Sequence, residues 1–245
     1  MFMGLLLNLV TTKIASNLVT TKLNGKGGYD GAMARASSSA NVDRRRTRLS
    51  AADRRAQIIE AATAVFAESG YQRSTMAQIA ARVGVTEPVL FQNFGSKVGL
   101  YSAVVEHAAT QMCTMMRTSA TEAESIAALL AHLLSSSHVD ALHAPGSLGV
   151  IFADAMTLYA EPAIEDAVRQ HMSDLAAVLA EVVLRGQQQG ELRADLDPHA
   201  AAWMVLSFLA AHRFRDAVMP DRQRLEQHIG AMTLRTLLAP TAPQE

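Results

Sequence analysis

Residues 74–101 read STMAQIAARVGVTEPVLFQNFGSKVGLY, and the fold class can be inferred outward from this segment. Thr75 followed by Gln78 matches a capping box, in which a hydroxyl accepts a free backbone N–H and the glutamine reaches back to the cap residue. Apolar residues follow at a spacing of three to four, and Gly84 can take the positive φ that ends a helix. Thr86 is then expected to cap a second short helix. Two short helices joined by a glycine turn predict a helix-turn-helix, whose second helix can lie in the major groove of DNA.

Around this segment the sequence resembles the tetracycline-repressor (TetR) family of transcription regulators. The residues that carry the resemblance are IIEAATAVFAESGY (58–71), IAARVGV (79–85), LFQNF (90–94) and Ser96-Lys97, in the order and spacing of that family. The resemblance implies an all-α fold, with an N-terminal three-helix DNA-binding domain followed by a helical domain that binds an effector and forms a dimer. We therefore expect a helix-turn-helix domain over residues 47–112 and an effector-binding and dimerisation domain over residues 113–245.

Composition agrees with packed helices. The chain has 245 residues, 49% hydrophobic but only 5% aromatic, which favours helices over sheets. Its single cysteine, Cys113, excludes an intramolecular disulfide framework and favours a reducing cytoplasm. No apolar run reaches the ~20 residues that a membrane-spanning helix needs. We expect a cytoplasmic protein without a membrane partner.

Charge is divided unevenly along the chain. Residues 42–100 contain nine Lys/Arg and five Asp/Glu, whereas residues 101–245 contain nine and seventeen. A basic front part and an acidic rear part favour a nucleic-acid-binding module attached to a body that does not bind nucleic acid. Random variation in surface charge remains the alternative.

The first 46 residues differ from the rest, being richer in Lys and Asn and containing NLVTTK twice, at 8–13 and 17–22. We expect a disordered, partly basic extension, because nothing in it buries enough apolar area to offset the cost of ordering. Translation from Met33 is an alternative start. Four arginines precede the first predicted helix and can lie along phosphates or enter the minor groove, as an arm of the DNA-binding module, with a solvated basic tail as the alternative; they are Arg44, Arg45, Arg46 and Arg48.

The second short helix is predicted to read DNA. Gln92 and Asn93 can each offer a donor and an acceptor to adenine, Glu87 can accept from cytosine, and Val89 offers methyl groups to thymine. We expect Leu90, Phe91 and Phe94 to carry the apolar bulk of this helix. The resemblance implies that Thr75, Thr86 and Lys97 touch phosphates. The alternative for the two amides is a solvated surface. The candidate DNA-contacting residues of this module are Thr75, Thr86, Glu87, Pro88, Val89, Gln92, Asn93 and Lys97.

Behind this module the sequence predicts a series of amphipathic helices. A long one begins after Ser96 and carries an apolar stripe to Met116, and others are predicted at 122–138, 147–160, 162–189, 198–218 and 221–238. Residues 200–211, AAAWMVLSFLAA, are apolar on nearly every side, so all faces of this helix must be covered. The family places its dimer interface on the last two helices; an intrachain core helix is the alternative. The candidate interface residues are Trp203, Leu206, Leu225, Ile229 and Met232.

The resemblance also implies a small-molecule pocket bounded by the middle helices of the rear domain. The candidate lining residues suggest an apolar or amphipathic effector, although methionines at helical spacing are often simple core; they are Met112, Met116, Phe152, Met156, Tyr159, His171 and Met172.

Signs of catalysis are few. The sequence contains no H-E-x-x-H, glycine-rich phosphate loop or nucleophile elbow. His138, Asp140 and His143 are the nearest approach to a metal site, but we predict them in a loop without ligand spacing. We expect no catalytic residues, metal or cofactor. The sequence therefore predicts a homodimeric DNA-binding repressor, released from a palindromic operator by a small effector. The alternatives are an architectural or ligand-independent DNA-binding protein, or a helical enzyme with an appended helix-turn-helix.

Overall fold

The computed structural model describes residues 50–158 and 161–240. Within them the regular elements are α-helices, apart from one isolated antiparallel bridge between Leu192 and Leu238, so the all-α prediction is confirmed. The extension 1–46, the alternative start at Met33 and some of the candidate site residues lie outside the described residues; the site residues are Arg44, Arg45, Arg46, Arg48 and Tyr159.

Three helices form the predicted helix-turn-helix module: α2 (Ala51–Arg73), α3 (Met76–Val83) and α4 (Glu87–Phe94). The capping box is confirmed, because the Gln78 backbone N–H donates to Thr75 Oγ1 over 3.2 Å and the Thr75 N–H donates to Gln78 Oε1 over 2.9 Å. Gly84 ends α3 with φ 75° and ψ 33°, the left-handed conformation that the turn requires.

The first helix has an internal break at Gly70, whose φ of 76° and ψ of 163° are not helical. After this break, Tyr71 packs back over the end of the helix. Its ring centroid lies 4.7 Å from that of Tyr101 and 6.0 Å from that of Phe66. Tyr101 in turn donates its hydroxyl proton to the Ile151 carbonyl over 2.7 Å. This aromatic group joins the module to the helices behind it.

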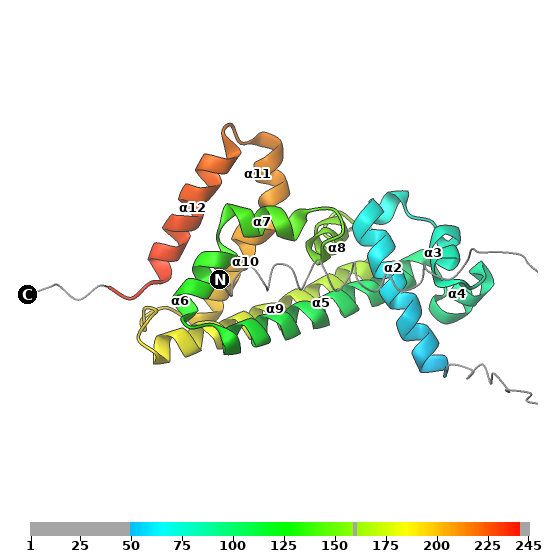
Figure 1. The fold of residues 1–245 in the computed structure, drawn as a ribbon, viewed down its shortest axis with the longest axis horizontal. Coiled ribbons are helices and arrows are strands. Elements are labelled where there is room, and N and C mark those ends of the chain that lie inside the picture. The colour runs from blue at the N-terminus through cyan, green and yellow to red at the C-terminus, as the bar shows by residue number, and fades with distance from the viewer. Residues whose placement is uncertain (1–49, 159–160, 241–245) are drawn as a thin grey trace, which may run out of the picture. The chain divides into compact units, whose positions relative to one another are not determined.

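Two long helices form the base of the rear part (Figure 1). They are α5 (Lys97–Glu122) and α9 (Pro162–Gln188), and they lie side by side along most of their lengths. The helix-turn-helix module packs at one end of α5, and α6 (Ile126–Leu133) packs at the other end.

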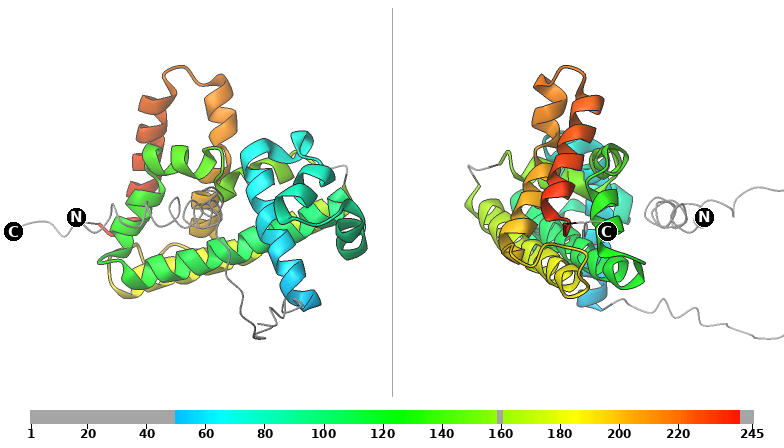
Figure 2. Two further views of the ribbon diagram at one scale, coloured as in Figure 1. Left: turned by 45° about the vertical axis from the view of Figure 1, so that its right-hand side comes forward. Right: turned by 90° about the vertical axis from the view of Figure 1, so that its left-hand side faces the viewer.

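Five further helices complete the described rear part. They are α7 (Ser136–His143), α8 (Leu148–Ala155), α10 (Pro198–Ala210), α11 (His212–Val218) and α12 (Arg222–Leu237). Figure 2 shows α11 and the beginning of α12 standing away from the α5–α9 pair. In the described part of the chain, no helix is both long and apolar enough to cross a membrane.

Three predicted helix boundaries are wrong. The helix predicted at 122–138 is two helices, because Ser135 is extended and its hydroxyl caps α7 by accepting the His138 N–H. His138, Asp140 and His143 consequently lie on α7 and not in a loop. The helix predicted at 147–160 ends at Ala155, and that predicted at 198–218 is interrupted at Ala211.

The apolar core has two clusters. One joins α2, α3, α4 and the first half of α5 to α8 and Ile164, and the other joins the end of α5 to α6, α7, α9, α10 and α12. Met112 and Met172 pack against both clusters. The domain boundary predicted at residue 112 falls at this junction and stays a prediction.

Candidate nucleic-acid interface and the body behind it

The helix α4 is anchored by one side and exposed on the other. Leu90 is fully buried and holds the inner side in the core of the module, where Phe94 packs beside it. Thr86, Glu87, Pro88 and Gln92 are exposed. Thr86 stands at the predicted cap position, but its hydroxyl accepts no cap hydrogen bond from the described backbone, in contrast to our expectation. That hydroxyl and the Glu87 N–H are therefore available to a phosphate oxygen, whereas Pro88 has no N–H and the Val89 N–H donates to the Thr86 carbonyl over 3.0 Å.

Phe91 departs from the prediction. We expected it to contribute inward bulk, but 47% of its surface is exposed. The reason is the helical period: each residue turns by about 100°, so burying Leu90 and Phe94 directs Phe91 outward with the residues three and four positions earlier. The outer face of α4 is therefore formed by Glu87, Pro88, Phe91 and Gln92.

Asn93 is half-buried and partly engaged within its own module. Its Nδ2 donates to the Val89 carbonyl over 2.7 Å, and its backbone carbonyl accepts from Arg55 Nη1 over 2.7 Å. The Arg55 guanidinium also lies 4.3 Å from the centroid of the Phe94 ring. Gln92 is more accessible than Asn93, so it is the better placed of the two predicted base-reading amides; base contact by either stays a prediction.

The predicted phosphate-contacting residues lie around this face. Thr75 and Thr86 are exposed at the N-terminal ends of α3 and α4. Lys97 is half-buried at the start of α5, with its Nζ 4.2 Å from the centroid of the Tyr71 ring. Burial lowers the pKa of Lys97. Its ammonium group is thus positioned by an aromatic ring and not by a carboxylate.

A carboxylate that the sequence analysis missed joins the module to two other helices. Asp154 of α8 accepts the Tyr71 backbone N–H at Oδ2 over 2.9 Å, and it accepts Arg213 Nη1 of α11 at Oδ1 over 2.9 Å. The only sequence signal for this residue is an acid within the apolar segment 148–155, LGVIFADA.

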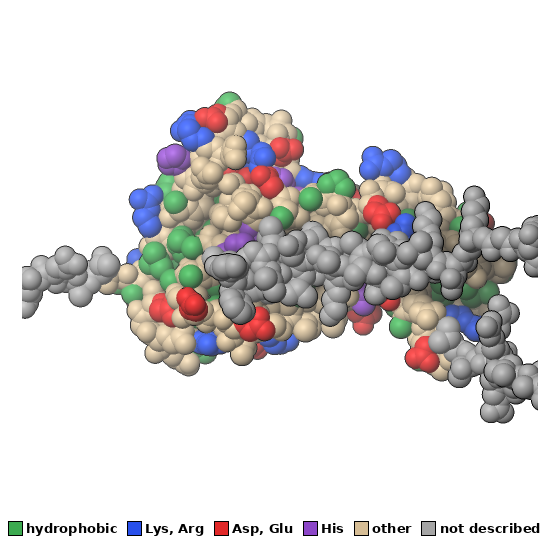
Figure 3. Space-filling view, viewed as in Figure 1, with side chains coloured by type: hydrophobic (Ala, Val, Ile, Leu, Met, Phe, Trp, Pro, Cys, Tyr) green, Lys and Arg blue, Asp and Glu red, His purple; other side chains and the backbone are tan. Residues whose placement is uncertain are grey.

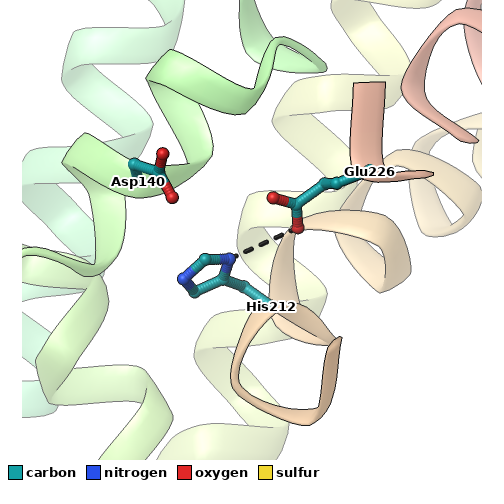
Figure 4. A group of neighbouring side chains, drawn as sticks. All are labelled: Asp140, His212 and Glu226. Atoms are coloured by element: carbon teal, nitrogen blue, oxygen red, sulfur yellow. Dashed lines mark hydrogen bonds and ion pairs between the residues drawn. The ribbon is translucent and has the colours of Figure 1, made fainter. Parts of the chain in front are cut away.

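A second missed group lies between α7, α11 and α12. The carboxylate of Glu226 is fully buried and accepts from Arg215 Nε over 2.7 Å, Arg222 Nη1 over 2.8 Å and His212 Nδ1 at 3.3 Å. Asp140 faces the same space from α7 (Figure 4) and accepts from Arg222 over 2.8 Å. Burial alone would raise the pKa of Glu226, but the hydrogen bonds from Arg215 and His212 outweigh burial and lower it.

This group has metal-ligating side chains but is satisfied by arginines. Ligand atoms of Asp140, His212 and Glu226 lie within 4.8 Å of one another. Two guanidinium groups already neutralise the carboxylates, so a divalent cation would have to displace them. Figure 3 likewise shows basic and acidic side chains next to each other over α11 and α12. We interpret the group as a buried ion-pair network that fixes α11 and α12 to α7.

The predicted effector-pocket residues are dispersed. Phe152 is buried, and the partly buried methionines Met112, Met116 and Met172 pack into the core clusters. Half-buried His171 contacts Asp174, with 3.3 Å between Nδ1 and Oδ2. Exposed Met156 borders a hollow of about 180 Å³ beside α9, lined also by Ala155, Glu165, Val168 and Arg169. Ligand pockets usually measure ~300–1,000 Å³, so an effector would need this hollow to widen.

The predicted dimer residues include both exposed and buried side chains. Trp203 is 47% and Met232 is 60% exposed, Leu225 and Ile229 are half-buried, and Leu206 is buried within its own chain. Within the single chain α10 has one exposed side, formed by Trp203, Ser207 and Ala210, so the chain alone does not cover every face of this helix, as the intrachain alternative would require. Two further apolar side chains, not predicted, are exposed on α11: Phe214 and Val218.

Comparisons with known proteins agree with this arrangement. The profile for "Bacterial regulatory proteins, tetR family" matches residues 58–104, and that for "Tetracyclin repressor-like, C-terminal domain" matches residues 159–232. The chain is 46% identical over 67 residues to the HTH-type transcriptional activator FasR of Mycolicibacterium smegmatis, a match that covers 27% of this chain and only 31% of FasR. It is 31% identical over 190 residues to the HTH-type transcriptional regulator TtgR of Pseudomonas putida, covering 72% of this chain and 86% of TtgR.

Solved structures share the fold at low sequence identity. A TetR-family regulator from Pectobacterium atrosepticum aligns with 80% of this chain and 100% of its own, at a TM-score of 0.61 and 22% identity. The FadR regulator of Bacillus subtilis, in complex with stearoyl-CoA, aligns with 74% of this chain and 98% of its own, at a TM-score of 0.55 and 21% identity. The capped helix-turn-helix, the helical body behind it and the match to TtgR over 72% of this chain lead to one conclusion: this chain belongs to the TetR family of transcriptional regulators.

Proposed function

We propose that the protein is a homodimeric repressor that binds a palindromic operator through α4 and is released by a small apolar or amphipathic effector. The observation that carries the proposal is the outer face of α4, where Glu87, Pro88, Phe91 and Gln92 are exposed on a helix anchored from behind by Leu90. A short helix with one buried and one exposed side is suited to lie in the major groove with its outer residues on base edges. The arm residues before α2 add phosphate contacts.

We propose that a second copy of the chain covers the exposed apolar side chains. Trp203 on α10 and Met232 on α12 are both largely exposed, and both belong to the last helices of the chain. Burying them against their two-fold equivalents removes apolar surface from water, and a two-fold dimer carries two copies of α4. Half-sites about 34–36 Å apart then fit one turn of DNA. We place this regulator in the cytoplasm, where its DNA is, and assign it no catalytic role.

The proposed effector binds in the body formed by residues 113–245, and residues 47–112 form the DNA-binding domain. Support for an apolar or amphipathic effector comes from the methionines at the junction of the two core clusters. Further support comes from FadR, which shares this fold and whose solved structure is a complex with the acyl compound stearoyl-CoA. An effector can lower operator affinity only to the extent that it binds the DNA-free conformation more tightly than the DNA-bound conformation.

The test is operator binding by the full chain, measured by fluorescence anisotropy on DNA from upstream of its own gene. Gln92→Ala should weaken specific binding by roughly tenfold or more, because a base-reading pair is worth ~1–3 kcal/mol per half-site. The matched control is Gln188→Ala, an exposed glutamine at the far end of α9, which should bind as the unaltered protein does. Equal affinity of both variants for every sequence tried would refute the proposal.

A ligand-independent DNA-binding protein is the second candidate, favoured by the small size of the hollow at Met156. Thermal unfolding against a series of acyl-CoA and fatty-acid concentrations distinguishes the two. Under the first proposal, the unfolding temperature rises with ligand concentration and operator affinity falls in the same range.

A further inference from the structure

Phe91 is an anomaly on the outer face of α4. The residue is 47% exposed, although its ring is large and apolar and its face is otherwise formed by Glu87, Pro88 and Gln92. The face on which it stands is the one proposed to meet DNA, so the inference rests on that proposed function.

The ring cannot simply turn inward. Leu90 fills the interior position beside it with no exposed surface, and Phe94 occupies the next position on the inner side. The end of α4 is held by the hydrogen bond from Arg55 to the Asn93 carbonyl, and the Arg55 guanidinium covers the Phe94 ring. Rotating α4 to bury Phe91 would break these contacts and expose Leu90. The outward position of Phe91 is therefore fixed by the packing of the module.

A phenyl ring has few possible partners in the major groove. It has no hydrogen-bonding group, so it offers nothing to a phosphate oxygen or to the polar edges of guanine, adenine and cytosine. The one apolar group that a base pair presents in the major groove is the C5-methyl of thymine. Contact between the ring and this methyl removes apolar surface of both from water.

We propose that Phe91 is a specificity-determining residue that reads a thymine methyl group in each half of the operator. It stands one residue from Gln92, so the thymine lies within or next to the base pairs that Gln92 contacts. The two residues divide the readout: the amide recognises hydrogen-bonding groups, and the ring recognises a methyl group.

The experiment uses the full chain and duplexes that it selects from a random-sequence DNA pool. Each thymine of the selected site is then replaced by deoxyuracil, which keeps the hydrogen-bonding groups and removes only the methyl. For the unaltered protein we expect one position per half-site where this replacement weakens binding about fourfold, or roughly 15-fold when both half-sites are changed, from the ~0.8 kcal/mol that one buried methyl contributes. For Phe91→Ala the same replacement should have no effect, and Phe91→Leu should keep part of it.

The variants must remain folded for this comparison, and the exposure of Phe91 makes that expected; their thermal unfolding temperatures are measured alongside. Gln92→Ala is the matched control, because it should weaken binding without removing the sensitivity to deoxyuracil. The inference is overturned if the unaltered protein and Phe91→Ala respond alike to deoxyuracil at every position, or if the selected site contains no sensitive thymine. If the chain selects no sequence at all, the proposed function itself fails, which is a different result.

Discussion

Replacing Gly70 by alanine should disturb the junction between the helix-turn-helix module and the body. Gly70 has φ 76° and ψ 163°, a region that is essentially restricted to glycine, so alanine there costs about 1–3 kcal/mol in backbone strain. A Cβ at this position would also lie 2.8 Å from Asp154 Oδ2, which forces the carboxylate away. That movement breaks the hydrogen bond from the Tyr71 N–H, and a bond to a charged group is worth about 1.5–3 kcal/mol.

Together the two effects predict a loss of about 2.5–6 kcal/mol, or roughly 5–24 °C in the midpoint of thermal unfolding for a unit of this size. The control is Gly84→Ala. Gly84 has φ 75° and ψ 33°, and a Cβ there would meet no atom of the described chain within 4 Å. Only the left-handed backbone cost of about 1–2 kcal/mol applies to it.

A double-mutant cycle separates strain from the lost hydrogen bond. In an Asp154→Ala background the carboxylate is absent, so Gly70→Ala should cost only the strain of about 1–3 kcal/mol. The assay is calorimetric unfolding of the four proteins at neutral pH. The reasoning is refuted if Gly70→Ala costs no more than Gly84→Ala, or if its cost is the same with and without the Asp154 carboxylate.

Three further predictions concern stability. Glu226→Gln leaves the buried guanidinium of Arg215 without its counter-charge and should cost about 3–5 kcal/mol in denaturant unfolding; a loss below about 1 kcal/mol would contradict the role of the ion pair. His138 has its pKa lowered from 6.5 to about 4, chiefly by burial. Between these values the unfolded chain binds a proton that the folded chain does not, so stability should fall as pH decreases from 6.5 to about 4. In His138→Gln that slope should flatten, whereas the exposed control His228→Gln should keep it. The pKa of Glu191 is lowered mainly by the Ala127 N–H, so its stabilising effect is present above the ordinary glutamate pKa and is lost as pH falls through the lowered value. Glu191→Gln should cost ~1 kcal/mol at neutral pH and progressively less as pH falls below the ordinary glutamate pKa, as denaturant midpoints would reveal.

The sequence predicted the helix-turn-helix because its signals are local. The Thr75–Gln78 box and Gly84 specify helix ends from residues at most a few positions apart, and the structure has both. The direction of Phe91 was not predictable in the same way. Val89, Leu90 and Phe91 are three consecutive apolar residues, and a rotation of one residue decides which of them faces outward.

The contacts that join the elements were missed because they are distant in sequence. Asp154 is 83 residues from Tyr71 and 59 residues from Arg213, so no periodicity links them. Glu226 lies in the polar segment 222–228, RQRLEQH, where an acid is expected to be solvent-exposed. Its burial results from α11 turning at Ala211, which brings His212 and Arg215 against α12.

The shared carboxylate of Asp154 has an evolutionary consequence. The Asp154 carboxylate accepts one hydrogen bond from α2 and one from α11, and one of its oxygens fills the space next to Gly70. Positions 70, 154 and 213 are therefore not free to vary separately. A descendant that replaces the acid by an apolar residue no longer needs arginine at position 213, and its residue 70 regains room for a side chain. Among homologues, substitutions at positions 70, 154 and 213 should therefore be correlated, and this correlation should be stronger than for any pair of exposed positions on the same helices.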